Sequence, residues 1–294
     1  MFSKRQLRYD YSGYLLLIPN YLIYTTFILY PVLRVIYLSF AQYRFVTPPT
    51  FAGLSNYLYL LESDRFRQAL FNTMYYWIGT VLVSMALGML IAVVLNRPKR
   101  GVSLFRSIYY LPNLLSLVVV GIAWLWIYNP QIGILNSFLR SVGWRTSDWL
   151  RDPDLAMTLV IIPGIWTLTG FNMIIYLAGL QGIDQSYYEV ADIEGAGSIR
   201  KLFSITLPLL RPISFFVFVM SSIRSFQVFE LIYIMTGGGP RGTTTTLTFE
   251  VYQMGFMHYQ MGRAAAASVV LMFIVLIVTV TNFWYGREGF NDAR

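Results

Sequence analysis

Four polar side chains interrupt long apolar runs of this chain, and their chemistry suits the binding of a hydroxylated solute. They are Asn172, Arg224, Gln227 and Glu230. Amide and carboxylate groups hydrogen-bond hydroxyl groups, and aromatic rings stack on the apolar face of a ring compound. The nearest aromatic residues are Phe226, Phe229 and Tyr233. We expect these three rings, together with Asn172, Gln227 and Glu230, to line a path for a polar molecule.

The same polar residues could instead hydrogen-bond neighbouring helices or pair with a second subunit. Arg224 and Glu230 are six residues apart. On a helix of about 3.6 residues per turn this spacing separates them by roughly 240°. We therefore expect each to find its partner elsewhere. Arg34 lies near the end of its apolar run and is expected to extend its charge towards water.

The sequence predicts no catalytic residues and no metal site. The cysteine count is zero, and His258 is the only histidine and has no neighbouring ligand set. A phosphate-binding loop needs a glycine directly before its lysine, but serine, proline and arginine precede Lys4, Lys99 and Lys201. We expect energy to come from another polypeptide or from an ion gradient. A membrane-embedded enzyme is the less favoured alternative.

The composition is that of a membrane protein. Hydrophobic residues make up 56% of the 294 residues and charged residues only 12%, whereas soluble domains carry about 45–50% and about 25%. Aromatic residues reach 17%, far too many for a disordered chain. The net charge of +8 comes from basic residues scattered among apolar runs, and we expect no nucleic-acid partner.

Six apolar runs are each long enough to cross a bilayer, which needs about 20 residues. They cover residues 14–40, 71–95, 104–128, 155–180, 213–234 and 264–284. The alternating polarity of barrel strands is lacking. The first run follows a basic segment but is too long for a signal peptide, so we expect it to be retained. The sequence predicts an all-α integral membrane protein of six transmembrane helices, with residues 1–294 forming a single transmembrane domain.

The basic residues predict the orientation of these helices. Lysine and arginine are more numerous on the side of the two termini, and all the lysines fall there. The positive-inside rule then places both termini in the cytoplasm. Aromatic residues such as Trp124, Trp126 and Trp284 lie near the ends of runs, as expected for the membrane boundary.

The connection 181–212 is too polar to span and too regular for a flexible linker. Apolar and small residues recur along it at helical spacing. They are Tyr188, Ala191, Gly195, Ile199, Leu202, Phe203 and Thr206. Because Gly195 and Gly197 weaken a continuous helix, we expect two short helices that meet at Gly195. From spacing alone, a helix lying in the lipid headgroups is an equal alternative.

A longer motif in this connection is similar to a known family signature. Glu189-Val-Ala191 is followed after three residues by Gly195, and after nine more by Ile205-Thr-Leu207-Pro208. The pattern resembles the cytoplasmic signature loop of binding-protein-dependent ABC importer permeases, and only Val190 departs from it. The segments Trp166–Asn172 and Ile232–Pro240 are similar to the maltose and oligosaccharide branch of that family.

The resemblance implies a function and a set of partners. It implies a sugar or oligosaccharide importer in the bacterial plasma (inner) membrane, driven by an ABC ATPase dimer that itself binds ATP and Mg, with no cofactor in this chain. It further implies a second, similar permease subunit, an extracytoplasmic sugar-binding protein and surrounding membrane lipid. The loop then forms a coupling helix that docks on the ATPase. By position, the coupling residues are Glu189, Ala191, Gly195, Ile205, Leu207 and Pro208.

The outer connections are the expected contacts of the binding protein. They cover residues 41–70, 129–154 and 236–263, and the second should contain a short interfacial helix with Ile132, Leu135, Phe138 and Leu139 at helical spacing. The resemblance implies a re-entrant contact loop at Gly237, Gly238, Gly239 and Pro240. The alternative is that these connections merely cap helix ends.

Two other functional classes remain as alternatives. A gradient-driven secondary transporter would need no ATPase, but it would carry ionisable relays in several spans, and only Arg224 and Glu230 lie deep in this chain. A structural or assembly subunit would not need the signature loop.

Overall fold

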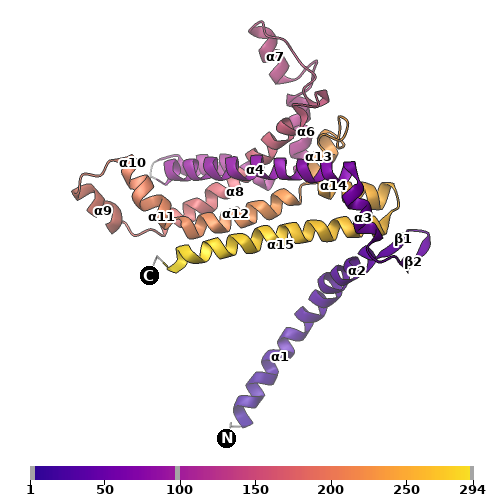
Figure 1. Ribbon diagram of the computed structural model, residues 1–294. Coiled ribbons are helices and arrows are strands. Elements are labelled where there is room, and N and C mark those ends of the chain that lie inside the picture. Colours follow the sequence, from indigo (N-terminus) through magenta and orange to yellow (C-terminus); the bar gives the residue numbers. More distant parts are fainter. Residues whose placement is uncertain (1–3, 97–99, 292–294) are drawn as a thin grey trace. The chain divides into compact units, whose positions relative to one another are not determined.

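The computed structural model describes the backbone of residues 4–96 and 100–291, which is mostly helical (Figure 1). By its internal contacts the chain divides into two compact units. Unit 1 comprises residues 1–62 and 251–270, and unit 2 comprises residues 63–250 and 271–294. Lys99 and the side chains of Lys4 and Trp284, which entered the orientation argument, lie outside the described part.

Unit 1 combines a long helical rod with a small hairpin. Its helices are α1 (Lys4–Tyr24), α2 (Tyr30–Ser39) and α3 (Ser55–Glu62), with π-helical turns at Thr25–Leu29 and Gln253–Met257. The end of α14 (Leu247–Tyr252) and the start of α15 (Met261–Asn291) also belong to it. Pro31 explains the first π turn. A proline ring clashes with the carbonyl four residues earlier, and one wider turn lets the helix continue through it.

The hairpin corrects the expectation of a purely α-helical chain. Strands β1 (Ala41–Arg44) and β2 (Thr47–Phe51) pair antiparallel, with Ala41 opposite Phe51 and a register shift before Arg44. The buried Asn56 side chain fixes this hairpin to α3. Its Nδ2 donates to the carbonyls of Ser39 and Ala41, both at 2.9 Å. Such short strands leave almost no periodic signal in a sequence.

Unit 2 is a helical bundle. It contains α4 (Asp64–Leu95), α5 (Val102–Leu114), α6 (Leu117–Ile127), α7 (Ile134–Ser141), α8 (Ala156–Gln181), α9 (Ser186–Ile193), α10 (Ser198–Lys201), α11 (Leu207–Leu209), α12 (Arg211–Phe226) and α13 (Glu230–Met235). A 3-10 turn at Trp149–Arg151 precedes α8, and a π-helical turn at Leu202–Thr206 precedes α11. The short helix expected in the second outer connection is present as α7.

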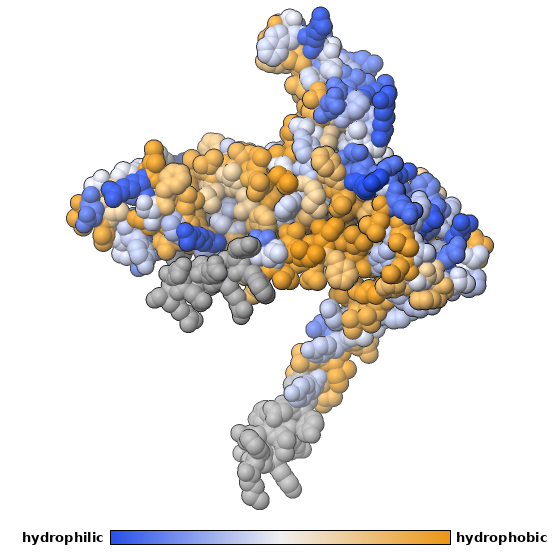
Figure 2. Space-filling model, viewed as in Figure 1, coloured by the Kyte–Doolittle hydropathy of each residue, from blue (hydrophilic) through white to orange (hydrophobic). Residues whose placement is uncertain are grey.

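The centre of unit 2 is the packing of α4 against α8, with α12 beside them (Figure 1). One part of this core is formed by Ala92, Leu95, Met173, Tyr176, Leu177, Leu180, Leu210 and Val217. Gly88 of α4 allows a close approach to α8, because a Cβ there would lie 2.7 Å from the Cβ of Asn172. Figure 2 shows hydrophobic residues over the middle of this bundle and hydrophilic residues around α7.

Within residues 4–96 and 100–291, four helices are long and apolar enough to cross a membrane: Tyr14–Ser39, Asp64–Leu95, Ala156–Gln181 and Met261–Phe283. The count reaches six if two bent pairs each form one span. One pair joins α5 to α6 and bends by 100°, and the other joins Ser198–Leu209 to α12 and bends by 67°. The run predicted at 213–234 is wrong as a continuous helix, because α12 ends at Phe226 and α13 begins only at Glu230. The six-span count and the cytoplasmic termini remain predictions.

Candidate functional site

Two helix breaks form the framework of the candidate site. Between α5 and α6 the chain is extended at Leu115 and Ser116, and the Ser116 hydroxyl accepts a hydrogen bond from the Val118 N–H at 3.3 Å. Between α12 and α13 the break covers residues 227–229. The backbone groups freed by a break in apolar surroundings need other hydrogen-bond partners, and in membrane proteins such breaks are buried in protein or line a water-filled cavity.

Threonine side chains donate hydrogen bonds to the backbone carbonyls that the second break leaves without helical partners. The Thr248 hydroxyl donates to the Phe226 carbonyl at 2.9 Å, and the Thr246 hydroxyl donates to the Val228 carbonyl at 3.3 Å. These two threonines come from the threonine-rich stretch that follows the glycine loop. That stretch therefore holds the break open, and its role could not be read from the local sequence of α12 and α13.

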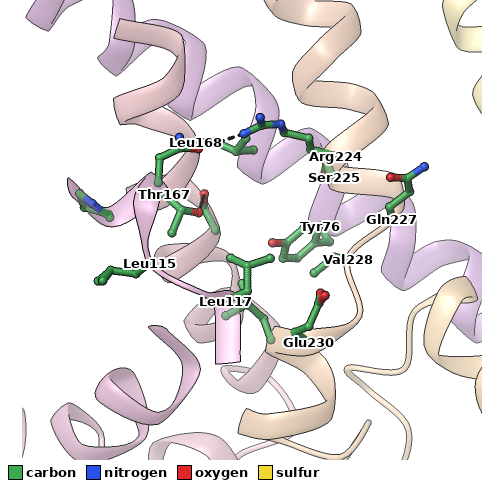
Figure 3. Close-up of a pocket in the computed structure, with 14 residues that line it drawn as sticks. Tyr76, Leu115, Leu117, Thr167, Leu168, Arg224, Ser225, Gln227, Val228 and Glu230 are labelled. Atoms are coloured by element: carbon green, nitrogen blue, oxygen red, sulfur yellow. Dashed lines mark hydrogen bonds between the residues drawn. The ribbon is translucent and has the colours of Figure 1, made fainter. Parts of the chain in front are cut away.

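A cavity of about 360 Å³ opens between the two breaks. Its polar lining residues are Tyr76, Asn113, Thr167, Arg224, Ser225, Gln227 and Glu230. Arg224 and Glu230 lie at opposite ends of it, and the Tyr76 side chain lies between them (Figure 3). The Ser225 hydroxyl is buried and makes no hydrogen bond within the described part of the chain. The cavity thus presents separate donors and acceptors to a polar ligand.

Arg224 and Glu230 do not pair with each other, as their spacing predicted. Arg224 Nη1 donates to Asn113 Oδ1 at 2.9 Å, and its guanidinium lies 3.8 Å from the centroid of the Phe171 ring. The charge is therefore held by α5 and α8 at the edge of the cavity.

Two of the six residues expected along a path line this cavity, namely Gln227 and Glu230. Phe226 is fully buried and stacks on Trp77, with ring centroids 5.3 Å apart. Phe229 and Tyr233 stack on each other at 5.5 Å. These three rings shape the packing around α13, and none of them is a lining residue.

Asn172 also lies in helix packing, as the interhelical alternative predicts. It is fully buried in α8, and its Nδ2 donates to Ser84 Oγ of α4 at 3.1 Å. Its Oδ1 accepts from Ser221 Oγ of α12 at 2.9 Å. This side chain joins three helices, and both ends of its amide are engaged, so it does not line the cavity.

Replacing Asn172 with leucine is expected to destabilise unit 2 by about 1–3 kcal/mol, because two interhelical hydrogen bonds are lost. The check is the temperature at which half of the detergent-purified protein survives heating, read by size-exclusion chromatography. Asn282→Leu is the matched control, since the hydrogen bond that Asn282 donates in the described part of the chain goes to Val278 of its own helix. Equal heat resistance of the two variants would contradict a joining role for Asn172.

The glycine loop expected to meet a binding protein is tightly folded. Gly238 is buried, and its carbonyl accepts from the Thr245 hydroxyl at 3.1 Å. Asn72 of α4 donates to the carbonyls of Gly242 and Thr245, both at 2.9 Å. Gly237 is exposed, and Gly239 and Pro240 are half-buried around a cis peptide bond. Only part of the predicted contact loop is thus open to solvent.

The connection 181–212 folds as the sequence predicted, as short helices separated near Gly195. Helix α9 ends in a Schellman motif, in which the Ala196 N–H donates to the Ala191 carbonyl at 2.8 Å and the Gly195 N–H to the Asp192 carbonyl at 3.0 Å. This cap needs a left-handed residue, and Gly195 has φ +74°. The Gly195 position is exposed, with nothing within 4 Å of where a Cβ would stand.

Two side-chain contacts close this segment into one folded piece. Tyr188 and Thr206 share a hydrogen bond of 3.0 Å between their hydroxyls, and Lys201 forms an ion pair with Asp192. At the start of the segment the Ser186 backbone N–H donates to the Asp184 carboxylate and lowers its pKa. The segment therefore has a defined shape that could fit a partner.

The predicted coupling residues differ in how far their side chains are buried. Ala191 is buried, Ile205, Leu207 and Pro208 are half-buried, and Glu189 and Gly195 are exposed. Large apolar side chains are also exposed between residues 187 and 203 of this segment, namely Tyr187, Val190, Ile193, Ile199 and Phe203. Ile193 is 86% exposed. We call these five residues the coupling-segment patch.

Several lining residues were not identified from the sequence. Tyr76 and Ser225 lie in apolar runs and carry no distinctive spacing. Asn113 had a usable signal, because it follows Pro112 in the middle of the run 104–128, where a polar residue after a proline indicates a break. The Thr246 and Thr248 contacts span about 20 residues of sequence, and no local pattern reveals them.

Together, these features define a class of protein. A membrane bundle with broken spans around a polar cavity, and with a folded polar segment between two of its helices, has the architecture of a membrane transport subunit. The comparisons with known proteins give the family. The chain belongs to the family of binding-protein-dependent transport system inner membrane components, whose model matches residues 84–287.

Curated relatives cover nearly the whole chain. The sn-glycerol-3-phosphate transport system permease protein UgpA of Agrobacterium fabrum is 35% identical over 92% of each chain. The trehalose/maltose transport system permease protein MalF of Thermococcus litoralis is 32% identical over 97% of each. The lactose transport system permease protein LacF of Rhizobium radiobacter is 35% identical over 95% of each. These relatives are transporter permease subunits, not enzymes.

A solved structure confirms the permease fold. A chain of the bacterial alginate ABC transporter, solved in complex with an alginate pentasaccharide-bound periplasmic protein, matches with a TM-score of 0.86. The match covers 97% of this chain and 96% of that one at 22% sequence identity. The likeness between the two chains is therefore one of fold. This chain is an ABC transporter permease, and the resemblance read from residues 189–208 is confirmed.

Proposed function

We propose that this chain is one of two permease subunits of an importer that takes up a sugar or oligosaccharide delivered by an extracytoplasmic binding protein. The observation that carries the proposal is the cavity between the two helix breaks. Its hydroxyl, amide, guanidinium and carboxylate groups are spread over several helices, which suits a ligand with many hydroxyl groups. Relatives named for trehalose, maltose and lactose transport support the substrate class.

The coupling-segment patch supports an ATP-driven mechanism. Five large apolar side chains exposed on a folded polar loop form a surface suited to a protein partner. We infer that an ABC ATPase dimer docks there and binds the ATP and Mg, while this chain holds neither. With both termini cytoplasmic and six spans in the bacterial plasma membrane, the patch would face the cytoplasm. Coupling requires that ATP and the loaded binding protein both favour the outward-facing state.

A relative that transports sn-glycerol-3-phosphate extends the range of substrates to test. Arg224 could hold a phosphate, but its guanidinium is already bonded to Asn113 and stacked on Phe171. Glu230 at the other end of the cavity disfavours an anion. The charges lining the cavity therefore favour a neutral sugar.

The test of the assembly is affinity purification in mild detergent from the native host. An ABC ATPase and a second permease should accompany the chain in stoichiometric amounts. Purification of the chain with neither partner, together with uptake driven by an ion gradient alone, would establish the secondary-transporter alternative instead.

A further inference from the structure

Unit 1 contains a second polar pocket, separate from the cavity of unit 2. It has a volume of about 260 Å³ and lies between the β1–β2 hairpin, the start of α3 and the start of α15. Two arginines line it, together with Gln42, Ser55, Asn56 and Gln260. No carboxylate is among its lining residues in the described part of unit 1. Such a pocket attracts an anion.

The pocket is built by close packing within unit 1. A side chain at Gly262 would collide with the Ala41 carbonyl and lie 3.2 Å from the Tyr43 nitrogen. Glycine at this position therefore lets the hairpin approach α15. That approach brings Arg44 of β1 to the same pocket as Arg263 of α15.

Arg263 is already oriented. Its guanidinium lies 3.5 Å from the centroid of the Tyr59 ring, and Nη1 donates to Gln260 Oε1 at 2.9 Å. Arg44 is exposed and forms no ion pair with any residue of the described chain. The guanidinium fork binds phosphate oxygens in pairs, so two such groups around one pocket suit a phosphate.

The depth of the pocket points to a lipid source for that phosphate. Arg44 follows the end of the candidate span Tyr14–Ser39 by five residues, and Arg263 lies in the first turn of the candidate span Met261–Phe283. Arg263 therefore lies at the end of one apolar helix and Arg44 just beyond the end of another, where the headgroup layer, about 5–8 Å thick, begins. Phe45, Val46 and Phe51 of the hairpin are exposed and apolar, as expected for a segment in contact with lipid.

We propose that the pocket formed by Arg44, Arg263 and their neighbours binds the phosphate headgroup of an anionic phospholipid. The volume exceeds that of several water molecules of about 30 Å³ each, which leaves room for a phosphate and part of its glycerol. The bound lipid would join the hairpin to α15. None of its lining residues belongs to the lining of the unit 2 cavity or to the coupling-segment patch.

The test is native mass spectrometry of the full-length chain, purified in detergent with its accompanying subunits and titrated with dioleoyl phosphatidylglycerol or dioleoyl phosphatidylcholine. We expect one phosphatidylglycerol retained about tenfold more tightly than phosphatidylcholine. The double variant Arg44→Gln/Arg263→Gln should lose that preference, whereas Arg145→Gln, an exposed arginine outside the pocket, should keep it. If the double variant does not fold, Arg44→Gln alone should weaken the preference, because Arg44 is exposed.

Three results would overturn the proposal. One is a double variant that retains phosphatidylglycerol as the natural chain does. Another is complete displacement of the lipid by millimolar inorganic phosphate, which would assign the pocket to a free anion. The third is loss of binding-protein association in the double variant with lipid retention unchanged, which would make the pocket a protein contact.

Discussion

Replacing Gly195 with aspartate is expected to reduce ATP-dependent uptake to background while the chain remains folded and inserted. Gly195 has φ +74° and closes the Schellman cap of α9. A side chain there meets nothing within this chain, so the internal cost is only the backbone strain of about 1–2 kcal/mol. An added carboxylate beside the coupling-segment patch would instead disturb the surface that we propose docks on the ATPase.

The chain offers a matched control for this variant. Gly143 closes α7 with the same cap, since the Trp144 N–H donates to the Leu139 carbonyl at 2.8 Å and the Gly143 N–H to the Arg140 carbonyl at 3.1 Å. Its φ is +75°, and nothing lies within 4 Å of its Cβ position. Gly143→Asp carries the same strain on a segment that we expect on the opposite side of the membrane.

The measurement is the amount of ATPase that co-purifies with each variant, together with ATP hydrolysis stimulated by the loaded binding protein. Gly143→Asp should retain both, and Gly195→Asp should lose both. Unimpaired co-purification and stimulation in Gly195→Asp would contradict the coupling assignment. Equal losses in the two variants would trace the defect to helix capping rather than to docking.

Replacing Glu230 with alanine is expected to raise the sugar concentration needed for half-maximal uptake by about ten- to a hundredfold. Glu230 begins α13 directly after the break and lines the cavity. A hydrogen bond to a charged group is worth about 1.5–3 kcal/mol, and Glu230 is the one carboxylate among the described residues that line this cavity. The maximal rate at saturating sugar should fall less, because the ATPase contact is unaffected.

The measurement for Glu230→Ala is concentration-dependent uptake in proteoliposomes at saturating binding protein. Glu62→Ala is the control, since it removes an exposed carboxylate from α3, outside the cavity. Stability in detergent should match the natural chain for both variants. If uptake by Glu230→Ala follows the same concentration curve as uptake by Glu62→Ala, the cavity does not lie on the substrate path.

The sequence predicted most of the helical framework because lipid-crossing helices depend on simple physics. Four of the six predicted runs match single candidate spans, and the run 104–128 became the bent pair α5–α6. The signature around Gly195 identified the family because its residues lie in one continuous segment. These features depend on hydropathy or local spacing, both of which a sequence displays directly.

The remaining features depend on contacts between distant residues. The hydropathy of the run 213–234 predicts one helix, yet the chain breaks after Phe226. The hydroxyls of Thr246 and Thr248 donate to backbone carbonyls at this break, in place of the N–H groups of a continuous helix. Asn172 was expected in the path, but Ser84 and Ser221 on two other helices occupy its amide. The hydropathy of a residue does not reveal its partner on another helix.

The most direct test of this account is sugar accumulation by the reconstituted complex in proteoliposomes. The account predicts accumulation only when ATP, the ATPase dimer and a sugar-loaded binding protein are all present, with hydrolysis stimulated by the loaded protein. Gly195→Asp should abolish this accumulation. Accumulation that persists without ATP, or that follows an imposed ion gradient, would contradict the central claim that this chain is the permease of an ATP-driven sugar importer.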